Sequence, residues 1–374
     1  MTRTVMAALF LLALTFNTAI LKAQGEPGAP FLLIAPGARA SGMGEANVAL
    51  ADDAVGGFYN PAGISWAEGR NFTFMRAKWL PNLVDDISYN FIGYSQYVDG
   101  LGSIGGHIIY LDLGEQVRTG ENSPDAIGTF QSFMLAVAGT YAADLSEKSA
   151  VGVSVKFVHQ DLAPFGAGQE KGSGSSSSFA FDVGLLTRDK FTSGLDFGIA
   201  IANIGPDIAF IDANQADPMP MNLKMGFSYM LFDGEFNSLR IVYDVNKLLV
   251  ASYPDRDLDG NGEKGELNVD GEEAHKDPFY KAFVTSWTDD SANIEWQKII
   301  HNFGAEYWYS GVVALRAGVF RDYLLKDADN SVALFKTIGV GLRYNTLGFD
   351  FGYVDGPEGH PITNTMRLSF NLAF

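Results

Sequence analysis

The sequence predicts an all-β transmembrane barrel of about fourteen antiparallel strands, set in an outer membrane and holding an N-terminal plug. Three observations predict it. Large apolar residues alternate with small or polar ones in segment after segment, connections are short at one end of these segments and mostly long at the other, and the last segment ends in Phe374. This is the pattern of a closed sheet that faces lipid outside and a polar lumen inside.

The composition agrees with this class and excludes others. The chain has 374 residues, with 26 Lys and Arg against 44 Asp and Glu, so its formal net charge is −18. Such an acidic chain lacks the basic residues that neutralise phosphates, which argues against nucleic acid as a partner. The absence of Cys excludes disulfide scaffolds, Cys-ligated zinc, iron–sulfur clusters and cysteine nucleophiles. Only 19% of the residues are charged, which suits a sheet against lipid.

Residues 1–23 have the pattern of a secretory signal peptide. Arg3 supplies a positive charge, residues 5–21 are mostly apolar, and cleavage fits after Ala23. An uncleaved membrane anchor is the alternative, but polar residues at 15, 17 and 18 interrupt an apolar run that is short for a full span. We therefore expect a protein exported to the outer membrane of a Gram-negative bacterium.

The mature chain alternates with a period of two residues. In one segment Val151, Val153 and Val155 alternate with Gly152 and Ser154. Most segments are close to the 9–11 residues with which a tilted strand crosses a bilayer. The predicted strands are 72–80, 86–97, 102–113, 130–143, 149–160, 178–188, 194–203, 222–232, 238–246, 300–309, 312–321, 333–344, 346–354 and 364–374.

The connections between these strands differ at the two ends. Those predicted as short are 98–101, 144–148, 189–193, 233–237, 310–311 and 345. Those predicted as long are 114–129, 161–177, 204–221, 247–299, 322–332 and 355–363, and segment 81–85 is the short exception among them. Short periplasmic turns and long outer loops are typical of bacterial barrels. A soluble all-β protein is the alternative, but the final strand with its terminal Phe374 resembles the signal that barrel-assembly machinery recognises.

The segment 24–70 precedes the strands and lacks their alternation. Residues 32–66 are rich in Gly and Ala, whose small side chains let backbone pack inside a narrow lumen, so this segment is predicted to be a plug. It contains ASGMGEA at 40–46, ADDA at 51–54 and NPAG at 60–63. The residues that define this plug motif are Gly42, Gly44, Asp52, Asp53, Asn60 and Pro61.

This motif is similar to the N-terminal hatch of FadL-type fatty-acid channels, and it resembles the PorV/PorQ family of outer-membrane proteins more closely. Segments 244–250, 303–307 and 347–353 strengthen the resemblance to the PorV type. The resemblance implies a component of the type IX secretion system. Such a protein binds the C-terminal signal domain of secreted cargo and carries it from the translocon to the sortase complex that attaches it to lipopolysaccharide.

Two other functions stay open from the sequence. A FadL-like transporter of hydrophobic small molecules would need an apolar pocket beside the plug and a lateral opening in the wall. An outer-membrane enzyme acting on lipopolysaccharide would need a nucleophile and a base together, whereas the five His residues fall on separate segments. We therefore expect no enzyme, no catalytic residue and no required cofactor.

Residues 255–266, DRDLDGNGEKGE, match the spacing of a calcium loop. Alternating carboxylates supply the hard oxygen ligands that Ca²⁺ prefers, and Gly260 permits the sharp turn. Gly262 stands where paired loops carry an apolar residue, and Pro254 argues against an entering helix, so a flexible acidic loop is the alternative. The candidate ligands are Asp255, Asp257, Asp259, Asn261, Glu263 and Glu266.

Two further features concern the outer rim and the lumen. Residues 289–300 are compatible with a short amphipathic helix or a plain loop, whose Ile294 and Trp296 then touch the membrane interface or a partner. Charged residues within the predicted strands form a polar ladder in the lumen, with a structural role expected by default. They are Lys156, Asp182, Asp196, Lys224, Arg240, Asp244, Arg316 and Arg367.

Overall fold

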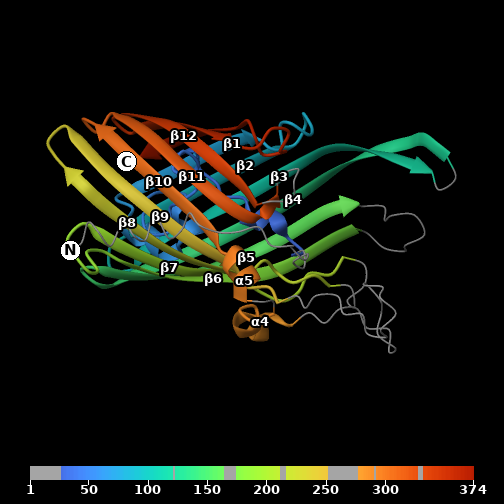
Figure 1. The fold of residues 1–374 in the computed structure, drawn as a ribbon, viewed down its shortest axis with the longest axis horizontal. Helices are drawn as coiled ribbons and strands as arrows, with labels where there is room; N and C mark the ends of the chain where they lie inside the picture. Colours follow the sequence, from blue (N-terminus) through green and yellow to red (C-terminus); the bar gives the residue numbers. More distant parts are fainter. Residues whose placement is uncertain are drawn as a thin grey trace.

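The computed structural model describes residues 27–120, 123–163, 174–210, 216–251, 277–289, 292–326 and 332–374. They form a closed barrel of fourteen antiparallel strands in sequence order, with β1 paired to β14 (Figure 1). The strands are β1 Arg70–Lys78, β2 Ser88–Val98, β3 Gly102–Gly120, β4 Ser123–Ser146, β5 Ser149–Ala163, β6 Gly174–Thr187, β7 Leu195–Ile204, β8 Asn222–Asp233, β9 Asn237–Leu248, β10 Ile300–Tyr309, β11 Val313–Lys326, β12 Val332–Tyr344, β13 Leu347–Asp355 and β14 Thr365–Ala373. The predicted barrel is thus confirmed.

Short helical segments complete the fold. Before the barrel come η1 Pro30–Leu33, α2 Ala38–Ser41, α3 Gly56–Tyr59 and η2 Pro61–Trp66, and between β9 and β10 come α4 Phe279–Thr285 and α5 Ala292–Gln297. Helix α2 packs against β12, β13 and β14, whereas η2 packs against β2 to β6 on the other side of the ring. The segment 27–67 therefore crosses the lumen, and we refer to it as the plug.

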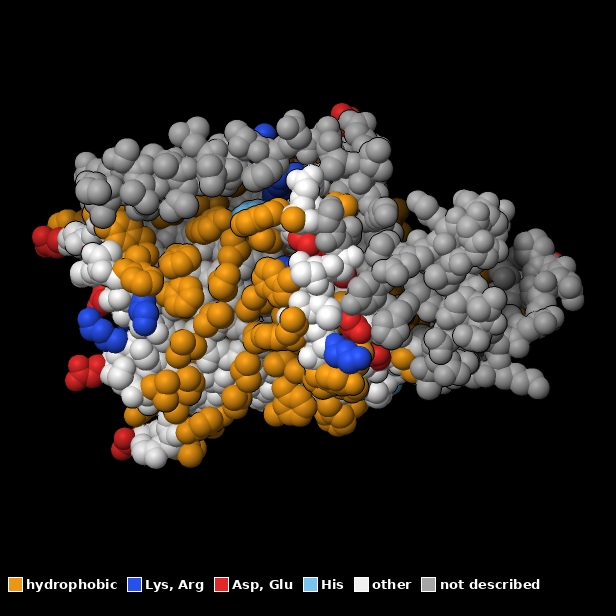
Figure 2. Space-filling view, turned by 60° about the horizontal axis from the view of Figure 1, so that its bottom comes forward, with side chains coloured by type: hydrophobic (Ala, Val, Ile, Leu, Met, Phe, Trp, Pro, Cys, Tyr) orange, Lys and Arg blue, Asp and Glu red, His pale blue; other side chains and the backbone are white. Residues whose placement is uncertain are grey.

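Side chains alternate between the two faces of the wall. On β5, Val153 and Val155 are about half exposed, whereas Ser154 and Lys156 between and beside them are buried. The apolar face therefore points outward, and Figure 2 shows the resulting hydrophobic band across the strands. Among the described residues, no helix is long and apolar enough to cross a bilayer.

One predicted connection is wrong. Segment 114–129 is not a loop, because β3 and β4 remain paired almost to their ends, including Val117 opposite Thr129. Strand β2 pairs with β3 only as far as Asp112, and β5 pairs with β4 only from Phe133. The remainder projects beyond the wall as a two-stranded ribbon (Figure 1). Cross-strand pairs of β-branched residues stabilise such a ribbon, although its Gly, Pro and charged residues indicate a loop from sequence alone.

The connection 205–221 also differs from an outward loop in its described parts. Ile208 and Asp217 form an isolated bridge, and Met219 is buried. The Gly28 N–H donates to the Pro218 carbonyl at 3.0 Å, so this segment folds against the start of the plug. In the long connection after β9, α5 matches the helical alternative predicted for 289–300, whereas α4 was not predicted.

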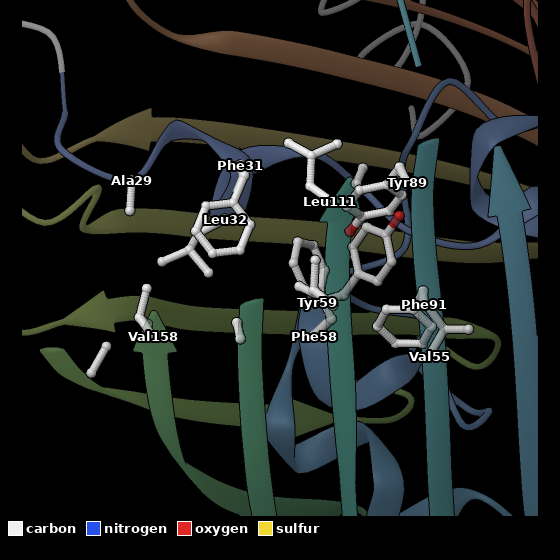
Figure 3. Close-up of a cluster of buried hydrophobic side chains, with 14 of the residues drawn as sticks. Ala29, Phe31, Leu32, Val55, Phe58, Tyr59, Tyr89, Phe91, Leu111 and Val158 are labelled. Carbon is white, nitrogen blue, oxygen red and sulfur yellow. The ribbon is translucent and has the colours of Figure 1, made fainter. Parts of the chain in front are cut away.

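A hydrophobic cluster joins the plug to the wall (Figure 3). Phe31 and Phe58 of the plug lie among Phe91 and other side chains of β2 and β3. Two buried tyrosines place their hydroxyl groups on plug carbonyls, Tyr59 donating to Pro36 at 2.7 Å and Tyr89 to Ile34 at 3.0 Å. The rings of both tyrosines pack among apolar side chains, while their hydroxyl groups donate hydrogen bonds. Both residues can therefore be buried without an unpaired hydroxyl group.

Candidate functional site

The plug sits against glycines of the wall. An added Cβ at Gly318 would lie 2.2 Å from the Gly44 nitrogen, and one at Gly198 would lie 2.5 Å from the Val48 carbonyl oxygen. Real side chains do not fit at such distances, so the strand glycines are what lets plug backbone lie against strand backbone. We call the strand glycines that lie this close to the plug the collar. They are Gly93, Gly152, Gly184, Gly198, Gly226, Gly304, Gly318, Gly339 and Gly352.

A buried ion network holds one side of the plug. The Arg39 guanidinium donates to both carboxylate oxygens of Glu306 on β10, at 2.9 Å each. The same carboxylate accepts from Arg316 of β11 at 2.8 Å, and Arg316 also donates to Asp350 of β13 at 2.8 Å. A third hydrogen bond from Arg39 reaches Asp52 within the plug at 2.6 Å. Paired and bidentate contacts of this kind combine strength with a defined geometry.

Further polar contacts lie on the same side. Glu45 of the plug accepts from Arg367 of β14 at 2.7 Å. The Gly44 N–H donates to the Thr337 hydroxyl at 2.9 Å, and its carbonyl accepts from the Asn302 amide at 2.8 Å. The five strands from β10 to β14, together with α2 and the turn after it, therefore share one set of ion pairs and hydrogen bonds. We call this set, with the Arg39–Glu306–Arg316–Asp350 network at its centre, the clamp.

The plug contacts β6, β8 and β9 mainly through its backbone. The Asp244 carboxylate of β9 accepts from the N–H groups of Asn47 at 2.6 Å and Val48 at 2.8 Å. Asn60 donates to the Leu185 carbonyl at 3.1 Å and accepts from the Ala62 N–H at 3.1 Å, and so caps η2. Here the Asp244 carboxylate and the Asn60 amide bond to backbone groups, in place of the ion pairs of the clamp.

A small cavity of about 70 Å³ lies beside Asp244 and is lined by residues of the plug, β8 and β9, and also by Glu45 and Asn302 of the clamp. Among its lining residues, Asn222, Asp244 and Asn246 each carry one buried side-chain oxygen without a hydrogen-bond partner. Lys224 also lines it and donates to the Phe58 carbonyl at 3.2 Å. An apolar cavity of about 150 Å³ can bind benzene, whereas a smaller polar one with free acceptors suits water.

The structure places every residue of the predicted plug motif in the plug. Gly42 and Gly44 lie against the collar, Asp52 and Asp53 lie beside Arg39, and Asn60 precedes Pro61 at the start of η2. Most charged residues of the predicted lumen ladder form ion pairs within the barrel. Lys156 pairs with Asp182 at 2.8 Å, and Arg240 pairs with Asp196 at 3.6 Å.

Arg39, Glu306 and Asp350 are clamp residues that were not predicted from the sequence. Each lies in or beside a segment noted for its resemblance, but nothing in the sequence pairs them. The six candidate calcium ligands between 255 and 266 lie outside the described residues, so the calcium site stays a prediction. In the part of the chain that is described, no group of three or more His, Asp or Glu is arranged to hold a metal ion.

A family model described as type IX secretion system protein PorV matches residues 22–255. The chain belongs to this family. The PorV match and the barrel together place it in the outer membrane, as predicted. No relative among curated proteins matches the sequence.

Similar solved structures include two toluene transporters and a FadL homologue. The toluene transporter TodX of Pseudomonas putida is 13% identical, with a TM-score of 0.51, and the match covers 95% of this chain and 98% of that one. The toluene transporter TbuX of Ralstonia pickettii is 15% identical, with a TM-score of 0.49 and coverage of 92% and 100%. A FadL homologue of Pseudomonas aeruginosa is 12% identical, with a TM-score of 0.42 and coverage of 95% and 98%. At such identities the TodX match establishes the fold alone.

Proposed function

We propose that this member of the PorV family is a non-enzymatic carrier of type IX secretion. It binds the C-terminal signal domain of secreted cargo at its outer surface and passes the cargo from the translocon to the cell-surface attachment complex. The barrel is its anchor in the membrane, and the plug keeps the lumen closed. Family membership supports the secretion system, and the geometry of the plug supports the role of an anchor.

The observation that carries the anchor role is the clamp. Glu306 is almost fully buried between Arg39 and Arg316, so moving the plug would leave charges unpaired in the lumen. Removing one partner of a buried ion pair typically costs about 3–5 kcal/mol. A plug held in this way suits a closed barrel better than a gated conduit.

The projecting ribbon of β3 and β4 supports outward binding. Beyond Asp112, eight residues of β3 extend past the paired wall, which corresponds to about 26 Å at ~3.3 Å per residue. Val117 and Ile127 on this ribbon are more than half exposed. Apolar side chains on an element that reaches away from the membrane are suited to contact a protein partner.

The direct test is a mild-detergent pull-down of the tagged full-length protein, followed by intact-mass and lipid analysis. Secreted proteins that retain their C-terminal signal domain, together with translocon or sortase subunits, would support the carrier. The double variant Val117→Ser with Ile127→Ser should capture less cargo. Val312→Ser, at an exposed valine of the opposite, periplasmic end, is the matched control and should capture as much cargo as the unchanged protein.

The alternative is a FadL-like transporter of hydrophobic small molecules. The fold shared with TodX is the reason to include the transporter in the test, whereas the small size of the cavity, about 70 Å³, supports the carrier. A fatty acid or other apolar ligand that co-purifies without a protein partner would favour the transporter and count against the carrier.

The calcium loop at 255–266 is a separate proposal that rests on sequence spacing. An ion bound there would order the long outer loop rather than take part in catalysis. Chelation, or Asp257→Ala with Asp259→Ala, should make segment 247–299 easier to cleave with protease. Unchanged protection would count against calcium binding.

A further inference from the structure

We propose that α4 and α5 form a membrane-interface anchor, which inserts apolar side chains into the outer leaflet beside the barrel. The side chains concerned are Tyr280, Phe283 and Val284 of α4 and Trp296 of α5, and we call them the anchor face. Both helices lie outside the barrel wall (Figure 1). This inference concerns lipid and does not depend on the identity of any cargo.

The inner side of α4 packs on the lipid side of the wall. Ala282 is 2% exposed and belongs to a hydrophobic cluster against which Ile201 of β7 and Leu223 of β8 pack. On β7, Ile201 stands between Ala200 and Ala202, which are buried toward the lumen, so Ile201 points outward. Helix α4 therefore lies on the outer surface of the barrel, close to the ends of β7 and β8 at the outer rim.

The opposite side of α4 is also apolar and it is open. Tyr280 is 66% exposed, Phe283 45% and Val284 67%, at the spacing that puts three residues on one helix face. Lys281 is the single charged residue among the seven of the helix. A short helix with apolar side chains on both its inner and its outer side is suited to an apolar medium and not to the water-facing surface of a domain.

The identity of that medium follows from continuity with the wall. Ile204, which packs beside α4, pairs with Phe181 of β6, and Phe181 is 51% exposed on the lipid-facing surface. The anchor face is thus next to the hydrophobic band of the barrel and near its outer edge. Trp and Tyr are enriched at this depth of a bilayer, and a long Lys side chain can reach from it to water.

Buried ion pairs hold α5 at a defined position. Glu295 accepts from Lys247, at the end of β9, at 2.5 Å and from Lys298 at 2.8 Å. Lys298 also contacts Asp289 at 3.4 Å, and Lys247 lies 5.1 Å from the centre of the Trp287 ring. These contacts tie both helices to the rim, so the anchor face cannot turn away from the membrane without leaving buried charges unpaired.

Spin labels on single cysteines test this depth directly, because the chain has no native Cys. The full-length protein would carry Val284→Cys and be reconstituted into vesicles of phosphatidylcholine and phosphatidylglycerol. Val155→Cys on the lipid-facing wall and Val117→Cys on the projecting ribbon are the references for lipid and water. Power saturation with oxygen and with a water-soluble nickel chelate then measures the depth of each label.

We expect the depth measured for the label at 284 to lie between the depths of the two reference labels, and nearer to that of the lipid-facing label at 155. A label at 284 as accessible to the nickel chelate as that at 117 would overturn the proposal and would leave the face open to a protein partner.

A pair of charge substitutions gives a second readout. Val284→Asp should lower the thermal stability of the reconstituted protein in vesicles more than Val117→Asp does, since only position 284 would enter lipid. Equal effects of the two substitutions would also contradict the anchor.

Discussion

The plug meets the two halves of the barrel in different ways. Toward β10–β14 it is held by the clamp, in which the buried Glu306 carboxylate lies between Arg39 and Arg316 and pairs with both. Toward β8 and β9 its backbone N–H groups donate to Asp244, beside a cavity in which buried side-chain oxygens of Asn222 and Asn246 have no protein partner.

The difference identifies the clamp as the part that determines where the plug lies. Removing one member of a buried charge network costs much stability, because the remaining charges are left unpaired. A substitution beside a cavity costs less, because water can take over the hydrogen bonds that the removed side chain made. The plug should therefore stay seated after alterations on the cavity side and shift after alterations on the clamp side. The following predictions test this contrast in order of expected effect.

The largest effect is expected for Glu306→Ala. The substitution leaves Arg39 and Arg316 without their shared carboxylate, and the loss should be about 3–5 kcal/mol of unfolding free energy. Denaturant unfolding of the purified barrel in detergent measures it. Asp85→Asn, at the exposed Lys78–Asp85 pair, is the control and should change the unfolding free energy very little. Equal losses of unfolding free energy in the two variants would show that the clamp does not hold the plug in position.

The next effect is expected in the glycine collar. Gly318→Ala places a methyl group against the backbone of Met43 and Gly44, and overpacking of this kind costs about 1–3 kcal/mol. It should also make Arg39 accessible to trypsin, because the plug must shift. Gly139→Ala is the matched control on β4, since an added Cβ there has no atom within 4 Å. Wild-type stability and protease resistance of Gly318→Ala would argue against close seating of the plug.

A smaller effect is expected on the cavity side. Asn222→Leu keeps a similar volume and removes a buried oxygen that has no partner in the protein. Replacing such a group by an apolar one is often nearly neutral, so the change in stability should stay below about 1 kcal/mol. The same unfolding assay measures it. A loss as large as that of Glu306→Ala would mean that both sides hold the plug equally.

The smallest effect is local and depends on pH. Burial raises the pKa of Glu295, but hydrogen bonds from Lys247 and Lys298 outweigh it and hold the pKa below its ordinary value of 4.5. The ionised form is thus favoured by the fold, so the stabilisation is present above pH 4.5 and is lost as the pH falls toward the lowered pKa.

A spin label at Asn293→Cys on α5 measures this effect. Its mobility should be constant between pH 6 and 8, values chosen as about the range in which carboxylates stay ionised, and should rise in acid. In the Glu295→Gln background the mobility should no longer depend on this titration. If the mobility of the label rises in acid by the same amount in the Glu295→Gln background, a group other than Glu295 is responsible.

The barrel itself was predictable because one face of every strand must meet lipid. The alternation of Val151, Val153 and Val155 with small or polar residues specifies both the strand and its outward face. The plug was predictable for a related reason, since small residues such as Gly42 and Gly44 are needed where backbone meets backbone. These are local patterns that a sequence displays directly.

The clamp and the outer helices were not predictable in the same way. Arg39 and Glu306 are 267 residues apart, and only the closed topology of the barrel brings them together. Helix α4 lacks the polar face by which an amphipathic helix is recognised. The ribbon of β3 and β4 was missed because its arms support each other through pairs such as Val117 and Thr129, which no single segment reveals.

The most direct test of the central claim is to lock the plug in place. An added Cβ at Gly352 would lie 3.1 Å from the Ser41 Cβ and 2.7 Å from the Ala38 carbonyl oxygen, so Ser41→Cys with Gly352→Cys needs the plug backbone to shift before it reaches disulfide geometry, and Gly352→Cys alone is the control for that shift. The double variant, oxidised or reduced, would be compared for surface attachment of cargo in a host that lacks its own copy. A closed anchor predicts equal attachment in both states. Attachment that fails on oxidation and returns on reduction would show that the plug must move.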